Sequence, residues 1–165
     1  MAVERTPELR PARAADVAAI AWIWYRGWRD GHLGNVPDEL VAVRPRESFD
    51  QRAAHRLAET TVAVVAGAVA GFVMVAGDEV EQVYVADAHR GTGVAGVLLA
   101  AAERRVLANG YDRAWLAVVA GNVRARKFYG RNGWTDEGLF THHAPSATGH
   151  VEVPAHRYVK ALAAS

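Results

Sequence analysis

Apolar residues recur at helical spacing in two long stretches of this chain. One stripe begins after Asp16, a residue type suited to capping a helix, and contains Ile20, Ile23, Trp24 and Trp28. The second stripe covers residues 94–109 and ends at Gly110; its apolar members are Ala95, Leu99, Ala102 and Val106. Shorter helical patterns occupy residues 49–57 and 122–129, with Asn122 as the cap of the latter. The chain therefore predicts about four helices, and residues 31–46 between the first two are expected to form a loop.

Short apolar segments elsewhere predict β-strands. They are residues 9–12, 62–66, 70–76, 79–85, 114–119, a segment from Trp134 onward, and 151–159. Turns at Gly67-Ala68 and Gly77-Asp78 make residues 62–85 three consecutive antiparallel strands. A crossover through the helix over 94–109 makes strands 79–85 and 114–119 parallel. A polar loop with His142, His143, Pro145 and Gly149 is expected between the last two strands.

Composition and charge narrow the functional classes. The length of 165 residues predicts a single domain over residues 1–165. The net charge of +1 argues against nucleic-acid or anionic-membrane partners. The chain has no cysteine, so thiolate nucleophiles and thiolate zinc sites are excluded. The uncharged stretch 60–77 is interrupted by Gly67 and Gly71 and predicts a buried hairpin instead of a membrane span. The first sixteen residues lack an apolar signal sequence, which predicts a cytoplasmic location.

A glycine-rich segment, Arg90-Gly91-Thr92-Gly93-Val94-Ala95-Gly96, joins a predicted strand to a predicted helix. Unpaired backbone N–H groups and the helix dipole favour a phosphate at such a place. The three glycines also satisfy a dinucleotide-binding pattern, but an antiparallel hairpin precedes them and no Lys-Ser or Lys-Thr pair completes a P-loop. The alternative is that these glycines serve only close packing.

The segment resembles the acyl-CoA pyrophosphate loop of the Gcn5-related N-acetyltransferases (GNAT). Residues 79–85 are similar to the central strand of that family, and its downstream signature is matched by Asn122, Ala125, Phe128, Tyr129, Gly133 and Trp134. Residues 86–88 depart from the family's acidic-Pro pattern, and Trp134 stands where Phe is commoner. The resemblance runs from Leu9 to Val159. It implies acetyl-CoA as cofactor. It also implies an α/β (α+β) fold, in which a mixed, mostly antiparallel central sheet of about six to seven strands is flanked by about four helices. The implied order of elements is β-α-α-β-β-β-α-β-α-β-β.

The resemblance also implies roles for individual side chains. An alkyl ammonium with a pKa of about 10.4 must lose a proton before it attacks a thioester, which requires a base or a water path. Glu79 stands where the family has its carboxylate base, with Glu81 on the same strand face, and Tyr129 where the family has the acid that protonates the thiolate. The alternatives are that Glu79 and Glu81 are exposed strand residues and that Tyr129 only packs beside Phe128.

The remaining predicted contacts divide into cofactor and acceptor sides. The cofactor side is expected to comprise Val83, Tyr84, Val85, Arg90, Gly91, Thr92, Gly93, Val94, Ala95, Gly96, Asn122 and Arg126. The acceptor side is expected to comprise Trp24, Trp28, His32 and His142, whose aromatic rings suit a cationic amine; Trp24 is equally suited to the core. His142 and His143 are adjacent and lack the helical spacing of paired ligands, so no metal is predicted.

These inferences lead to one leading function and two alternatives. The chain is predicted to be an acetyl-CoA-dependent N-acetyltransferase that acts on a small-molecule primary amine. Transfer is direct within a ternary complex, since no cysteine can carry an acyl group. The alternatives are a protein N-terminal or lysine acetyltransferase, and a non-catalytic acyl-CoA-binding regulatory module. A homodimer is one possible assembly.

Overall fold

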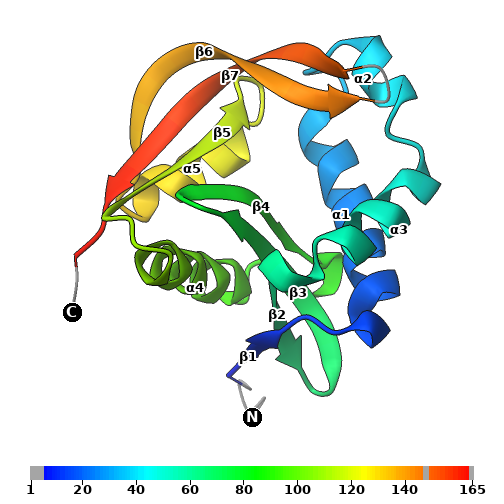
Figure 1. Ribbon diagram of the computed structural model, residues 1–165, viewed down its shortest axis with the longest axis vertical. Helices are drawn as coiled ribbons and strands as arrows, with labels where there is room; N and C mark the ends of the chain where they lie inside the picture. The colour runs from blue at the N-terminus through cyan, green and yellow to red at the C-terminus, as the bar shows by residue number, and fades with distance from the viewer. Residues whose placement is uncertain (1–5, 147–148, 164–165) are drawn as a thin grey trace.

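The computed structural model describes residues 6–146 and 149–163. Twelve main elements follow one another along the chain (Figure 1). They are β1 (Glu8–Pro11), α1 (Val17–His32), α2 (Asp38–Ala42), α3 (Arg46–His55), β2 (Thr60–Val65), β3 (Ala68–Ala76), β4 (Glu79–Val85), α4 (Val94–Ala108), β5 (Arg113–Val119), α5 (Val123–Arg131), β6 (Thr135–Ser146) and β7 (Gly149–Ala161). Short 3₁₀ turns precede α1, β2 and the glycine-rich segment.

The strands form one seven-stranded sheet in the order β1-β2-β3-β4-β5-β7-β6. Every neighbouring pair is antiparallel except β4 and β5, which are parallel as the crossover through α4 requires. The predicted fold class and strand number are confirmed. The chain has one helix more than expected, because α2 forms within residues 31–46, which were predicted to be a loop. Its five residues bury only Leu40, so it is too short to show a helical period.

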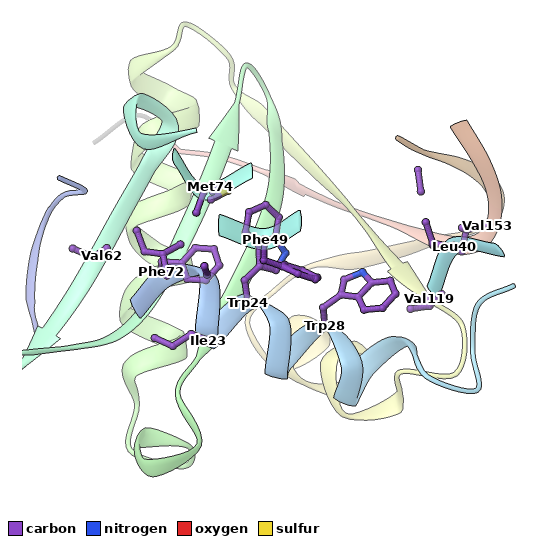
Figure 2. Close-up of a cluster of buried hydrophobic side chains, with 14 of the residues drawn as sticks. Ile23, Trp24, Trp28, Leu40, Phe49, Val62, Phe72, Met74, Val119 and Val153 are labelled. Atoms are coloured by element: carbon purple, nitrogen blue, oxygen red, sulfur yellow. The ribbon is translucent and has the colours of Figure 1, made fainter. Parts of the chain in front are cut away.

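Two apolar layers cover the two faces of the sheet, because side chains alternate along its strands. In β3, Phe72 and Met74 face α1 and α3, while Val73 and Val75 face α4. Figure 2 shows Trp24, Phe49 and Phe72 at the centre of the first layer, with Trp28 extending toward Val119 and Val153. Leu98, Leu99 and Val106 of α4 lie at the centre of the second layer. None of the described helices is long and apolar enough to cross a membrane.

The parallel strands β4 and β5 separate soon after they meet (Figure 1). Their pairing register contains only Glu79 opposite Trp115, supported by the Trp115 backbone N–H, which donates to the Asp78 carbonyl over 3.1 Å. Strand β5 instead pairs along its whole length with β7. The edge of β4 that faces β5 is thus left without a strand partner over Val83–Val85.

Several local expectations needed correction. The first hairpin turns at Ala66 and Gly67, whose φ angles are 52° and 80°, one residue earlier than predicted. His142, His143 and Pro145 lie in β6 and not in a loop, since the last two strands pair up to Ser146 and Gly149. The Asp16 carboxylate does not cap α1; it accepts hydrogen bonds from the Arg10 guanidinium and from the Arg13 backbone N–H. It thereby joins β1 to the turn before α1.

Candidate active site

A cavity of about 370 Å³ occupies the gap between β4 and β5. Helices α1, α2, α3 and α5 and the β6–β7 hairpin contribute the rest of its wall. Residues predicted for catalysis, cofactor binding and acceptor binding meet here although they come from four elements and one helix cap. They are Trp28, His32, Glu79, Glu81, Val83, Tyr84, Asn122, Tyr129 and His142.

A β-bulge in β4 brings both predicted carboxylates into this cavity. Met74 is opposite Gln82 and Val75 is opposite Val80, so Glu81 has no partner on β3 and the strand gains one residue there. Val80 is buried against the α4 layer, whereas Glu79 and Glu81 on either side of it line the cavity.

The two carboxylates differ in their surroundings. Glu81 forms an ion pair with Arg56 at 2.5 Å. Glu79 has no ion pair within the described part of the chain, and burial raises its pKa to about 7, with a further contribution from the Glu81 charge. A carboxylate with this pKa is well matched to proton transfer near neutral pH.

Two tyrosines line the cavity beside the carboxylates. Burial raises the pKa of Tyr129 and of Tyr84 above the usual value, so both hydroxyls stay protonated at neutral pH. Tyr129 projects from α5, and its ring packs against those of Phe128, Trp134 and Tyr158. Tyr84 packs so closely on α1 that a Cβ at Gly27 would overlap its ring. Both phenols therefore occupy fixed positions.

Asn122 connects α5 to α1 at the end of β5. Its Oδ1 accepts a hydrogen bond from the Ala125 backbone N–H over 3.3 Å, which confirms the predicted helix cap. Its Nδ2 would lie 2.7 Å from a Cβ at Gly31, so only glycine fits there on α1. The remaining face of the amide lines the cavity.

The glycine-rich segment forms an anion-binding geometry at the N-terminus of α4. Gly91 and Gly93 have φ angles of 75° and 88°, which favour glycine. The backbone N–H groups of residues 91–96 have no intramolecular acceptor among the described residues. Six free donors at the positive end of a 15-residue helix suit a pyrophosphate. Arg90 flanks them, but its guanidinium is already paired with Asp30 at 2.8 Å and Asp87 at 3.2 Å.

His32 and Trp28, both predicted for the acceptor side, line the cavity together. Their rings stack with centroids 4.7 Å apart and an interplanar angle of 9°. The His32 Nδ1 lies 2.8 Å from the Trp28 carbonyl oxygen, to which it must donate, so Nε2 is left as an acceptor. Burial and the nearby arginines lower the pKa of His32 to about 4, so the ring is neutral at pH 7. Burial also lowers the pKa of His142.

Two predicted contacts lie elsewhere. Trp24 has no exposed surface and packs between Phe49 and Phe72, so we assign it to the core and not to the acceptor wall. Arg126 donates to the Ala120 carbonyl, the Tyr158 hydroxyl and the Asp136 carboxylate. These partners direct the Arg126 side chain toward β7 and β6, so Arg126 braces α5 against the sheet.

Sequence reasoning missed three arginines that line the cavity, namely Arg44, Arg52 and Arg56. One signal was available. Arg52 follows Phe49 by three residues and therefore lies on the apolar face of α3, where an arginine requires a specific partner. The outward-facing charges of α3, such as Glu47, carry no such signal.

Three exposed side chains on the β6–β7 hairpin also come together. Ligand atoms of His143, His150 and Glu152 lie within 4.8 Å of one another, because His143 is opposite Glu152 in the strand register. The prediction that excluded a metal considered only helical spacing and did not consider cross-strand pairs. These three residues do not include Glu79 or Glu81, and the acetyl-transfer chemistry proposed below does not use them.

Comparisons with known proteins agree with this geometry. A model of the Acetyltransferase (GNAT) family matches residues 17–134. A solved GCN5-related N-acetyltransferase from Rhodopseudomonas palustris, described as aminotransferase, class-II, is 23% identical with a TM-score of 0.74, covering 98% of this chain and 99% of that one. No curated protein matches this chain in sequence.

Two further solved structures have the same fold. The PaiA N-acetyltransferase from Thermoplasma acidophilum, in complex with coenzyme A, is 15% identical with a TM-score of 0.71, covering 95% of this chain and 99% of that one. A phosphinothricin acetyltransferase from Sinorhizobium meliloti, in complex with acetyl-CoA, is 20% identical with a TM-score of 0.69, covering 96% and 89%. At these identities the structures establish the fold, while the family model covers most of the chain. The chain therefore belongs to the GNAT acetyltransferase family.

Proposed function

We propose that this chain is an acetyl-CoA-dependent N-acetyltransferase that transfers an acetyl group directly to a small-molecule primary amine. The observation that carries the proposal is that one cavity contains a carboxylate with a pKa of about 7 and a protonated phenol. Amide formation from an ammonium and a thioester is assisted by a group of each kind, a base for the ammonium and an acid for the departing thiolate. Support also comes from the two neighbours of the same fold in complex with coenzyme A or acetyl-CoA.

The cofactor would be held along one side of this cavity. The free N–H groups of residues 91–96 suit its pyrophosphate, and the unpaired edge of β4 over Val83–Val85 suits the amides of its pantetheine arm. Asn122 lies across the gap from that edge. When bound, acetyl-CoA supplies an acetyl group already activated as a thioester.

Glu79 acts as the base in this proposal. Its carboxylate accepts a proton from the acceptor ammonium, which frees the nitrogen lone pair for attack on the acyl carbon. The raised pKa brings the carboxylate closer to the ammonium value of about 10.4, which makes the proton transfer less unfavourable. Glu81 pairs with Arg56 and lies beside Glu79, and its charge contributes to the raised pKa of Glu79.

Tyr129 acts as the acid. Its hydroxyl keeps its proton until a thiolate with a reference pKa of about 8.5 departs, and then donates that proton to sulfur. Backbone N–H groups on the open edge of β4 are suited to donate to the acyl oxygen as negative charge develops there. His32 is neutral and offers Nε2 as an acceptor to the incoming amine.

A small acceptor is favoured over a protein because the cavity measures only about 370 Å³ and residues of α1, α3 and β6 wall the side predicted for the acceptor. A homodimer and a cytoplasmic location stay predictions of the sequence.

The test is a thiol-release assay with purified protein, acetyl-CoA and a panel of small amines and peptides. We expect turnover with at least one small amine, and the acetylated product should be identified by mass spectrometry. Turnover confined to peptides would favour a protein acetyltransferase. Calorimetric binding of acetyl-CoA without any turnover would instead favour a regulatory module, and absence of binding would refute the proposal.

A further inference from the structure

The acceptor side of the cavity contains cations that no carboxylate neutralises. Its basic residues are Arg44, Arg52 and Arg56, and its acidic residues are Glu79 and Glu81. Arg56 is fully compensated, since it pairs with Glu81 at 2.5 Å and with Glu59 at 2.8 Å. Arg44 and Arg52 form no ion pair within residues 6–146 and 149–163.

Arg52 packs against aromatic rings and has no polar partner among the described residues. Its Cζ lies 4.2 Å from the centroid of the Trp24 ring and 5.3 Å from that of Phe49. Its Nη1 is buried and makes no hydrogen bond to any described residue. A buried guanidinium donor without an acceptor costs free energy, and an arginine cannot escape that cost by losing its proton at neutral pH. The Arg52 side chain therefore has a buried donor free for a hydrogen-bond acceptor that the described residues do not provide.

Arg44 adds a second uncompensated charge. Its side chain is only 7% exposed, and its hydrogen bonds go to the carbonyl oxygens of Val43 and Pro145. Carbonyls satisfy its donors but do not neutralise its charge. Each arginine lowers the pKa of His32, which shows that their positive potential reaches the inner wall of the cavity.

The phosphates of the cofactor are not suitable partners for these arginines. The glycine-rich loop leads into α4, which packs on one face of the sheet, whereas α3 with Arg52 packs on the other. The anion that meets Arg52 must therefore arrive with the acceptor. The face of Trp24 is also covered by Arg52, so it cannot offer the cation–π contact expected for a purely cationic acceptor.

We propose that the acceptor carries a carboxylate beside its amine, as an amino acid does, and that Arg52 with Arg44 binds this carboxylate while Glu79 receives the ammonium. The inference rests on the proposed function and specifies its substrate class. Opposite charges at the two ends of the cavity orient a small zwitterion with its nitrogen toward the base. Trp24 then acts as a positioning residue, since it holds the guanidinium in place.

The experiment uses a panel of amino acids, each compared with its carboxamide and with its decarboxylated amine. For the best substrate, kcat/KM of the acid should exceed that of the neutral analogues about 10- to 100-fold, as expected for a charge-assisted hydrogen-bonded pair. Arg52→Gln should abolish that preference, because the acid should lose far more kcat/KM than its neutral analogues. Arg52→Lys should restore part of it, because the charge returns without the planar fork.

Arg46→Gln is the matched control. Arg46 lies on the same helix and also stacks over aromatic rings, but it pairs with Asp50 and does not line the cavity. It should leave the acid preference unchanged. Equal rates for acid and carboxamide in the native chain, or an Arg52→Gln loss that is the same for all three acceptor types, would overturn the inference while leaving acetyl transfer intact.

Calorimetry in the presence of coenzyme A separates this inference from the proposed function. Preferential binding of the acid that is lost in Arg52→Gln supports the carboxylate site even when no acetylation occurs. Such binding without acetylation would refute the proposed acetyl transfer but not the carboxylate site. Failure of every amino acid to bind better than its carboxamide would refute the site.

Discussion

Replacing Glu79 with glutamine tests the base directly, and the structure determines how the effect should vary with pH. An ordinary glutamate would be ionised at every pH of interest, and the loss would then be largest at low pH, where the amine is most protonated. Here burial and the Glu81 charge raise the pKa of Glu79 to about 7. Below that pH the native side chain becomes protonated and can no longer accept a proton, so kcat/KM of the native protein should fall with the ionised fraction of Glu79.

The magnitude follows from this pKa. About one tenth of the Glu79 side chains are ionised at pH 6 and about nine tenths at pH 8, so kcat/KM of the native protein should rise about tenfold between them. General-base catalysis contributes about 100- to 10,000-fold. Glu79→Gln should therefore lose about that factor at pH 8, and its profile should have no ionisation near pH 7. Thiol release at fixed low acceptor concentration measures the profile.

Neighbouring substitutions should shift the native profile in opposite directions. Glu81→Gln removes a negative charge beside Glu79, so the apparent pKa should fall and activity should persist to lower pH. Arg56→Gln removes a positive charge that lowers the pKa of Glu79, so the apparent pKa should rise. A native pH profile in Glu79→Gln, or profiles that do not move in the two neighbouring variants, would refute the assignment of Glu79 as the base.

The same pKa has a consequence for stability. Between pH 4.5 and about 7 the folded protein binds a proton at Glu79 that the unfolded chain has released, so the contribution of Glu79 to stability falls as pH rises through this window. Glu79→Gln should therefore have a higher Tm than the native protein at pH 8 and an equal Tm at pH 4. A lower Tm at pH 8 would contradict the uncompensated burial of this carboxylate.

Three further substitutions test other parts of the site. Tyr129→Phe should lower kcat about 100-fold with an unchanged calorimetric Kd for coenzyme A, and equal loss of both would indicate a packing role. Gly93→Ala should cost about 1–2 kcal/mol in urea unfolding and weaken coenzyme A binding, because φ is 88°, whereas Gly130→Ala within α5 should do neither. Gly27→Ala should cost about 1–3 kcal/mol, since its Cβ would overlap the Tyr84 ring; unchanged stability would contradict that contact.

Elements with strong local signals were predicted closely from the sequence. Strand β4 has the predicted bounds Glu79–Val85, because a Gly-Asp turn ends the preceding strand and the pattern changes after it. Helix α4 covers Val94–Ala108, between two glycines whose positive φ angles begin and end it. The Asn122 cap is confirmed for the same reason, since the residue type and its neighbour three positions later decide it.

Other features depend on residues far apart in the chain. Whether Trp24 meets substrate or core is decided by Phe49 and Phe72, and whether Arg126 is free is decided by Tyr158 and Asp136. The His143 group arises from cross-strand register. No local pattern distinguishes these outcomes, because each residue type is common in both environments.

The sequence by itself determined the order of the elements apart from α2, the glycine-rich turn before a helix and the residue types suited to acid and base chemistry. Turn chemistry, capping and side-chain periodicity act over a few residues and can therefore be read along the chain. Only the tertiary structure decided that β4 and β5 separate and that a bulge directs both Glu79 and Glu81 into the gap. It also decided that Arg52 has a buried donor with no hydrogen-bond acceptor among the described residues. Burial, register and electrostatic potential are sums over neighbours brought together by folding, and they set the pKa of Glu79 and leave the charge of Arg52 uncompensated.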